Sequence, residues 1–145
     1  MRIISVTRLR LRSVRFLFSL SWEMWKLRRC LRKAPGFLIG KLLADRHRTF
    51  WTMTLWKDTD SMVAFRNSSV HKAVMPKAAR WCDEASVVHW QTEADQLPHW
   101  DEAYRRMSES GKLSPLKFPS ADYKAHKYQK PCINKHNRLV VLPRK

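Results

Sequence analysis

The sequence predicts an α+β fold of the ferredoxin-like type, and three observations support this prediction. Residues 49–56 are only β-branched, aromatic or large apolar residues, and the polar cluster 57–60 follows them, which is typical of a buried strand that ends in a turn. Apolar residues then recur at helical spacing as far as Trp81, and residues 86–91 again have the composition of a strand. Together with strand, helix and strand patterns within residues 3–43, the order is βαββαβ, the ferredoxin-like arrangement with an antiparallel sheet.

Residues 3–12 are expected to form the first strand. Arginine alternates here with leucine and threonine, and successive side chains of a strand point to opposite faces. Arg8, Arg10 and Arg12 should therefore share one face. Two interpretations stay open: the arginines form a solvated row, or their guanidinium groups hold a carboxylate or a propionate.

A helix is expected over residues 14–33, because apolar residues form a broad face there and four cations fill the last turns. Pro35 and Gly36 end this helix, and residues 37–43 resume as a strand. Asp58 or Thr59 can cap the next helix, which should be interrupted at residues 67–69 and bent or restarted near Pro76.

The domain is expected to span residues 1–110, with an added helix at about 99–110. Residues 111–145 contain four of the seven prolines, many lysines and little periodicity. We therefore expect residues 111–145 to form an extended or disordered basic tail. Because residues 122–145 lack a core pattern, we expect their removal to leave the melting temperature within a few degrees.

Composition indicates an ordinary globular domain with charged ends. The chain has 145 residues, 44% of them hydrophobic, with seven Trp, which is enough for one core. The net charge of +17 is uneven, since residues 51–100 carry 5 basic and 6 acidic groups while residues 1–50 carry 13 and 2. The basic ends would attract a polyanion such as nucleic acid, but the neutral middle does not favour a dedicated nucleic-acid module.

The cysteines indicate a reducing compartment, and we expect a cytoplasmic protein. Cys30, Cys82 and Cys132 are too few and too scattered for a disulfide framework. No uncharged run near the start is long enough to span a bilayer, and no secretory signal is evident. The Arg-rich start also suits an organelle transit peptide, although the strand pattern accounts for it equally well.

Motif analysis finds no Gly-rich phosphate loop, no G-x-S-x-G and no H-E-x-x-H. Cys132 and His136 have a spacing that suits two metal ligands, but the third and fourth ligands of a zinc site are missing. We therefore expect no metal site.

A resemblance to a known superfamily rests on residues 36–121. It is carried by the strand that ends at Trp56, the acidic turn after it, Met62 with Phe65, the run NSSVHK at residues 67–72, the run LPHWDEAYRRM at residues 97–107, and the motifs GKLS at 111–114 and PS at 119–120. These features resemble the dimeric α/β-barrel superfamily, which includes the antibiotic-biosynthesis monooxygenases, the haem-degrading monooxygenases and the chlorite dismutases. The greatest likeness is to an uncharacterised branch near spheroidene monooxygenase.

The resemblance implies a homodimer and a pocket for an apolar or aromatic small molecule. Helices cover one face of a ferredoxin-like sheet, and the bare apolar face would be buried against a second copy. The pocket between sheet and helices would be lined by large residues, which are equally well explained as ordinary core. These residues are Trp51, Met53, Leu55, Phe65 and Trp90.

His71 and His89 are the candidate catalytic residues. His71 and Met75 share a helical face and could present an axial ligand to haem. In the haem-degrading branch the axial histidine aligns with Met75 and a tryptophan aligns with Phe65, so that particular reaction is not expected. A structural, hydrogen-bonded histidine is the alternative interpretation of His71.

Two functions follow from these observations. The first is a monooxygenase-like enzyme that acts on an apolar or aromatic molecule, with or without haem. The second is a non-catalytic dimeric module that binds a small ligand or a polyanion, in which case binding to the polyanion would depend steeply on salt.

Overall fold

The computed structural model describes residues 1–144 and contains one antiparallel sheet of six strands with the order β5-β4-β1-β3-β2-β6. The predicted α+β, ferredoxin-like class is confirmed, because β1, β2, β3 and β4 occupy the four central positions, with α1 between β1 and β2 and with α2 and α3 between β3 and β4. The strands are β1 (Arg2–Leu11), β2 (Phe37–Asp45), β3 (Thr49–Trp56), β4 (Cys82–Thr92), β5 (Lys112–Leu113) and β6 (Arg138–Val141).

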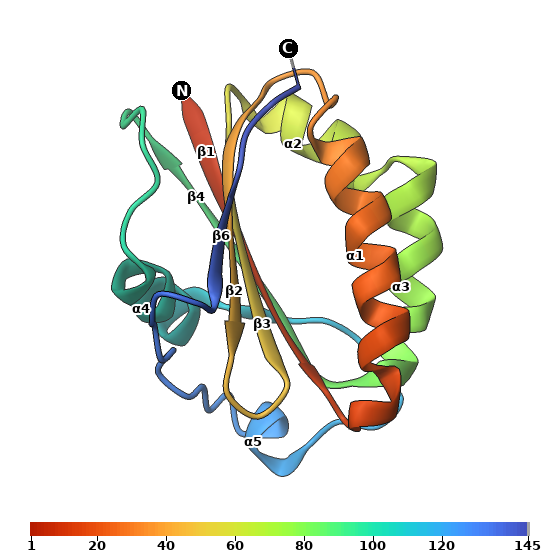
Figure 1. The fold of residues 1–145 in the computed structure, drawn as a ribbon. Coiled ribbons are helices and arrows are strands. Elements are labelled where there is room, and N and C mark those ends of the chain that lie inside the picture. Colours follow the sequence, from red (N-terminus) through yellow and green to blue (C-terminus); the bar gives the residue numbers. More distant parts are fainter. Residues whose placement is uncertain (145) are drawn as a thin grey trace.

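Helices lie on both sides of this sheet (Figure 1). On one side are α1 (Leu17–Leu31), which follows the short 3-10 helix η1 (Val14–Phe16), together with α2 (Thr59–Arg66) and α3 (Ser69–Trp81). On the other side lies α4 (Trp100–Ser110), and the short α5 (Ala121–Lys124) lies near one end of the sheet. No described helix is long and apolar enough to cross a membrane.

The helix boundaries follow from capping chemistry. The Asp58 side chain accepts a hydrogen bond from the Ser61 backbone N–H at 2.8 Å, and Ser68 caps α3 in the same way through the N–H of His71. The predicted interruption falls at Asn67, where α2 ends, while Pro76 lies inside α3 without ending it. Gly36 has a φ of 83°, a conformation that L-residues with a side chain rarely adopt, and this allows the turn into β2.

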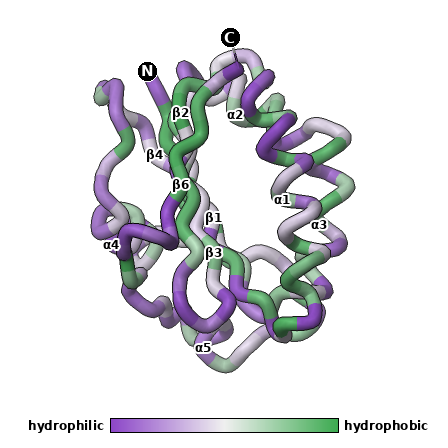
Figure 2. The backbone as a smooth tube through the Cα atoms, viewed as in Figure 1, coloured by the Kyte–Doolittle hydropathy of each residue, from purple (hydrophilic) through white to green (hydrophobic). Residues whose placement is uncertain are grey.

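A dense hydrophobic core fills the space between the sheet and α4. Trp51, Met53 and Leu55 of β3 are fully buried there, and Trp100 and Met107 of α4 pack against them. Figure 2 shows hydrophobic residues concentrated along β2, β3 and β6, with hydrophilic residues in the loops below the sheet. We call the side of the sheet that α4 covers the closed face.

The closed face corrects the expectation of a bare sheet face. That face is covered within the chain by α4 and by Tyr128 and Ile133 of the following segment. The physical reason for expecting a partner subunit there is therefore removed. The homodimer itself stays a prediction.

The C-terminal segment also differs from the expected disordered tail. β5 pairs with β4, β6 pairs with β2, and Tyr123 and Val141 are buried. The sequence could not indicate this, because each short element contributes only one or two buried side chains and so leaves no periodic pattern. Residues 111–144 therefore belong to the same folded unit as residues 1–110.

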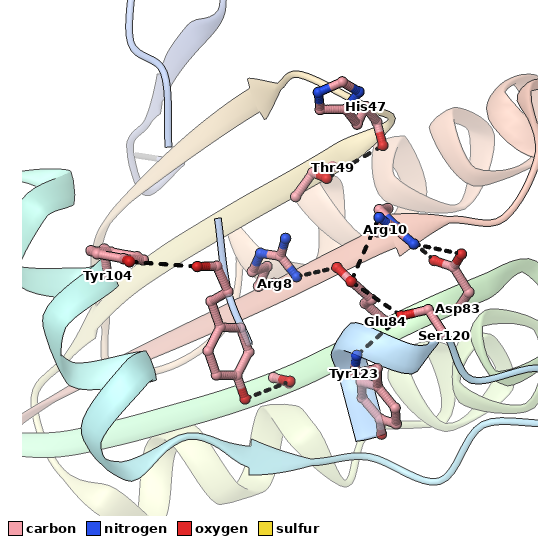
Figure 3. Close-up of polar contacts among 11 residues, drawn as sticks. Arg8, Arg10, His47, Thr49, Asp83, Glu84, Tyr104, Ser120 and Tyr123 are labelled. Carbon is pink, nitrogen blue, oxygen red and sulfur yellow. Dashed lines mark hydrogen bonds and ion pairs between the residues drawn. The ribbon is translucent and has the colours of Figure 1, made fainter. Parts of the chain in front are cut away.

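Ion pairs join β1 to β4, and Ser120 of the C-terminal segment contacts one of them (Figure 3). Arg8 of β1 pairs with Glu84 of β4, and both side chains are almost fully buried. Arg10 binds Asp83 through two hydrogen bonds of 2.9 Å, and the Ser120 hydroxyl donates to Glu84 at 3.3 Å. Arg8 and Arg10 thus hold carboxylates, and these carboxylates belong to the chain itself. Arg12, the third arginine of the predicted row, lies beyond the end of β1, and its Nε donates to the Arg80 carbonyl at 2.7 Å.

Candidate functional site

A cavity of about 330 Å³ lies on the opposite side of the sheet, beneath α1, α2 and α3. The helices pack closely on the sheet at two ends, in a cluster around Trp56 and Met62 and in another around Leu11 and Leu20. Sheet residues between these clusters, such as Thr7 and Thr52, line the cavity and are only partly buried. We call this side of the sheet the hollow face.

The floor of the cavity is a double row of side chains that crosses four strands. The pairing register places His89, Ser5, Thr54 and Gly40 in one transverse row and Val87, Thr7, Thr52 and Leu42 in the next. The floor therefore combines four hydroxyl groups with a histidine at one side. The Trp56 indole N–H donates to the Thr54 hydroxyl oxygen at 2.9 Å, so that oxygen is partly engaged within the floor.

The roof of the cavity is mainly apolar. It consists of side chains that recur at helical spacing on α1 and α3, namely Leu20, Met24, Leu27, Leu31, Val74, Met75 and Ala78. Arg28 and Arg66 also line the cavity. An apolar ligand with polar groups on one side would match this division between roof and floor.

His71 is the histidine in the first turn of α3, where the cap at Ser68 fixes the start of the helix. Its ring lies 5.7 Å from the ring of Phe65 in an edge-to-face arrangement, and its Nδ1 is buried without a hydrogen-bond partner among the described residues. Burial, followed by the positive charge of Arg66, lowers the pKa of His71. The imidazole is therefore neutral at pH 7 and can accept a proton or bind a metal.

His89 lies at the end of the hydroxyl row on β4 and is more exposed than His71. Burial lowers the pKa of His89, and the positive charges of Lys112 and Arg66 lower it further. Two neutral imidazoles therefore line one cavity.

The structure divides the residues expected at the site into two groups. His71, Met75, His89 and Phe65 line the cavity.

The other four residues require a correction. Trp51, Met53 and Leu55 lie in the core of the closed face, and Trp90 packs against the same core. Successive side chains of a strand point to opposite faces, so Trp51, Met53 and Leu55 face away from the cavity, whereas Phe50, Thr52, Thr54 and Trp56 of the same strand line it.

The sequence analysis missed Ser5, Thr7, Thr52 and Thr54. The signal was present in β3, where small hydroxyl residues alternate with large apolar ones as Thr52, Met53, Thr54 and Leu55. Alternation alone could not say which set faces the helices. The register with β1, which pairs Ser5 with Thr54 and Thr7 with Thr52, is what gathers the four hydroxyls into one floor.

A metal centre is not formed by the described residues. No group of three or more His, Cys, Asp or Glu side chains in residues 1–144 is placed to hold a metal ion.

The donors needed for haem are partly present. His71 could supply a neutral axial imidazole through its free Nδ1, and Arg28 and Arg66 could pair with propionates. When bound, haem would supply oxygen activation at its iron.

The fold is similar to that of solved proteins described as oxygenases or monooxygenases. A variant of SnoaB, a cofactor-independent oxygenase from Streptomyces nogalater, is similar with a TM-score of 0.54 and 15% identity over 68% of this chain and 98% of that one. An antibiotic biosynthesis monooxygenase matches with a TM-score of 0.57 and 13% identity over 63% and 99% of the two chains. A conserved protein from Methanosarcina mazei Go1 matches with a TM-score of 0.58 and 14% identity over 64% and 94%. At these identities the likeness concerns the fold.

A family model described as a domain of unknown function, DUF3291, matches residues 27–118. The chain belongs to this family. No curated protein matches the sequence.

Proposed function

We propose that this chain is a monooxygenase-like protein whose cavity binds a small apolar or aromatic molecule that carries oxygen substituents. The observation that carries the proposal is a cavity with an apolar roof, a floor of four hydroxyl groups and, in its wall, a half-buried His71 whose lowered pKa keeps the imidazole neutral at pH 7. Apolar walls with a few placed polar groups are the usual composition of small-molecule sites.

The volume of the cavity limits the size of the ligand. A volume of about 330 Å³ is near the lower end of the range of roughly 300–1,000 Å³ for ligand pockets. Two or three fused rings would fill it. A larger ligand such as a porphyrin would require α1 and α3 to move away from the sheet.

The reaction that suits this site is oxygenation of a weakly acidic substrate by molecular oxygen. A neutral imidazole can remove a proton from an activated methylene or hydroxyl group, and the surrounding apolar side chains keep water away from the resulting anion. For a methylene substrate and one O₂, the carbon becomes a carbonyl and the second oxygen atom leaves as water. The two hydrogens of that water come from the methylene, so no external reductant is needed. The cofactor-independent oxygenase among the similar structures supports this class of reaction.

Oxygen uptake with anthrone, whose central methylene is acidic, tests the proposal. We expect enzyme-dependent uptake of one O₂ per anthraquinone formed, and a loss of about 10²-fold or more in His71→Gln, since general acid–base catalysis typically contributes that much. His136→Gln, which changes an exposed histidine of the C-terminal segment, is the matched control. Saturable binding of anthrone without oxygen uptake would contradict the enzyme and leave a small-ligand-binding module.

Haem is a second candidate ligand, favoured by the free Nδ1 of His71 and by Arg28 and Arg66 in the same wall. The finer resemblance to the branch near spheroidene monooxygenase also supports it. Titration with haemin should give a Soret band that survives gel filtration and is lost in His71→Ala, with the thermal stability of the protein nearly unchanged. Equal spectra for the two proteins would exclude His71 as the axial ligand.

A further inference from the structure

The outer face of α1 is unusual because its aromatic residues point into solvent. Phe18 is 83% exposed, Trp22 53% and Trp25 41%, and Val14 just before the helix is 69% exposed. These positions recur at intervals of three and four residues, so they form one stripe along the helix. The inner face of the same helix packs Leu20 and Leu31 into the core. Folding of the chain therefore does not explain the stripe, and exposed apolar patches of this kind mark contact surfaces.

Positive charge surrounds this aromatic stripe. Within α1 and α3 there are six Lys and Arg residues, of which Arg28 lines the inner cavity, and a single carboxylate, Glu23. Glu23 is buried and binds Lys26 at 3.0 Å and Lys77 at 2.8 Å, so it offers no negative charge to an external partner. The outer surface of both helices therefore presents cations without exposed carboxylates.

A groove continues the stripe at the C-terminal end of α1. It has a volume of about 490 Å³ and lies between α1 and the start of α3. Trp25, Lys26, Arg29 and Lys33 line one side together with the ion-paired Glu23, and Ser69 lies on the other. The Arg29 guanidinium lies over the ring of Trp25, 4.9 Å from the ring centroid, so a cation adjoins the aromatic stripe. A groove with these side chains would bind phosphate groups.

We propose that the outer face of α1 binds the surface of an anionic lipid bilayer. Helices that lie in the membrane interface combine Trp, Phe and Leu on one side with Lys and Arg beside them, as this surface does. The aromatic stripe would enter the boundary between headgroups and acyl chains, and the cations of the groove would contact lipid phosphates. A protein docked in this way could collect an apolar ligand from the bilayer.

Two other occupants are less favoured by the same observations. A second copy would bring the cations of two α1 helices together, and like charges oppose such contact. Single-stranded nucleic acid would use the aromatic rings and the cations but gains little from the exposed Val14 and Leu17. Only an anionic bilayer, with its hydrocarbon interior and its phosphates, uses both the apolar and the cationic side chains of this surface.

Flotation of the full-length protein with vesicles tests this proposal. We expect binding to phosphatidylcholine vesicles that contain about 30% phosphatidylserine, weaker binding to phosphatidylcholine alone, and loss of binding as salt rises from about 50 to about 500 mM. Phe18→Ser with Trp22→Ser should weaken binding about tenfold or more, since apolar burial contributes directly to interfacial binding. Leu139→Ser with Leu142→Ser, which changes exposed apolar residues of the C-terminal segment, is the matched control and should bind as the wild type does.

Charge is tested with a second matched pair. Arg29→Gln with Lys33→Gln should weaken binding to the anionic vesicles, whereas Lys124→Gln with Lys127→Gln, on exposed residues outside α1 and α3, should leave it unchanged. Circular dichroism melts should show the same Tm for all four variants, because all the altered residues are exposed.

Several results would overturn the proposal. Absence of flotation by the wild type, or equal losses in the control variants, would exclude a specific membrane face. Tight binding of a fluorescent oligouridine that is lost in the Phe18 and Trp22 variant, without vesicle binding, would assign the face to nucleic acid. A dimer in sedimentation velocity that the same variant converts to a monomer would assign it to a second copy.

Discussion

The two faces of the sheet are built from the same four long strands but are packed in opposite ways. On the closed face, Trp51, Met53 and Leu55 are fully buried against α4. On the hollow face, the intervening Thr52 and Thr54 line a cavity beneath α1, α2 and α3. One strand, β3, therefore supplies Trp51, Met53 and Leu55 to a core and Thr52 and Thr54 to the floor of a cavity.

This difference separates a densely packed region from an unfilled cavity within one small domain. A densely packed interior gives most of the free energy of folding. The side chains that line an unfilled apolar space lack van der Waals contacts on one side and stabilise the fold less. A chain that keeps such a space needs a well-packed region elsewhere. Here that region is the closed face, which is completed by α4 and the C-terminal segment rather than by a second subunit.

Sedimentation equilibrium tests the consequence for assembly. Because the closed face is covered within the chain, any homodimer would use another surface. Substitutions on that other surface, rather than of buried closed-face residues, should then be the ones that separate the subunits. The homodimer predicted from the sequence is thus a separate question from how the sheet is covered.

The largest expected effect comes from removal of the C-terminal segment. Deleting residues 121–145 should lower the free energy of unfolding by about 3–6 kcal/mol, since Tyr123 and Val141 are buried and a buried apolar side chain contributes about 1.5–3 kcal/mol. Urea denaturation measures this effect. The sequence alone predicts that this deletion has little effect on stability.

A matched pair of substitutions tests whether the loss of stability on deletion comes from the buried side chains or only from the shorter chain. Tyr123→Ala should be clearly destabilising, whereas Leu139→Ala, at a residue that is 45% exposed, should change the free energy of unfolding by less than about 1 kcal/mol. Equal small effects in both variants would mean that the segment does not help to close the fold.

The second expected effect compares neighbours on β3. Trp51→Ala should cost about 3–5 kcal/mol because it leaves a large void in the closed face. Thr52→Ala, one residue further on, should cost less than about 1 kcal/mol because its side chain lines a cavity. The comparison of the two faces would fail if both substitutions were equally damaging in urea titrations.

Much of the fold could be predicted from the sequence. The element order, the cap at Asp58 and the interruption at Asn67 depend on local chemistry and on apolar periodicity, and the structure has all three. The role of residues 111–144 could not be predicted, because a strand of four residues such as β6 gains its place from pairing with a distant strand.

The candidate site was predictable only in its helical part. His71, Met75 and Phe65 lie on elements whose periodicity indicates an inner face, and the structure places them in the cavity wall. The strand residues were assigned to the wrong face, because alternation defines two faces without saying which one the helices cover. The hydroxyl floor depends on the register of several strands, which no single stretch of sequence contains.

The third prediction compares substitutions of two alanines that lie on helices on opposite sides of the sheet. Ala103→Leu in α4 should destabilise the protein by about 1–3 kcal/mol, since it overfills the closed face. Ala78→Leu in α3 adds the same atoms beside the cavity and should be neutral or stabilise the protein by up to about 1 kcal/mol while it weakens ligand binding. Thermal unfolding and a ligand titration measure both changes, and destabilisation by Ala78→Leu equal to that by Ala103→Leu would mean that the hollow face is packed as tightly as the closed one.

The smallest effect concerns the pH dependence of stability, which should come from the hollow face through His71. Burial and Arg66 lower the pKa of His71 in the folded protein below its ordinary value of 6.5, so the unfolded chain binds the proton more readily. Stability should therefore rise with pH in the window between the lowered pKa and 6.5, and it should be lost as the pH falls through that window. His71→Gln should flatten this part of the curve in urea titrations across the acidic range, whereas His136→Gln, at an exposed residue, should leave it unchanged. A curve of the same shape in wild type and His71→Gln would show that His71 is charged or solvated in the folded state, and the proposed proton acceptor of the cavity would then have to be His89.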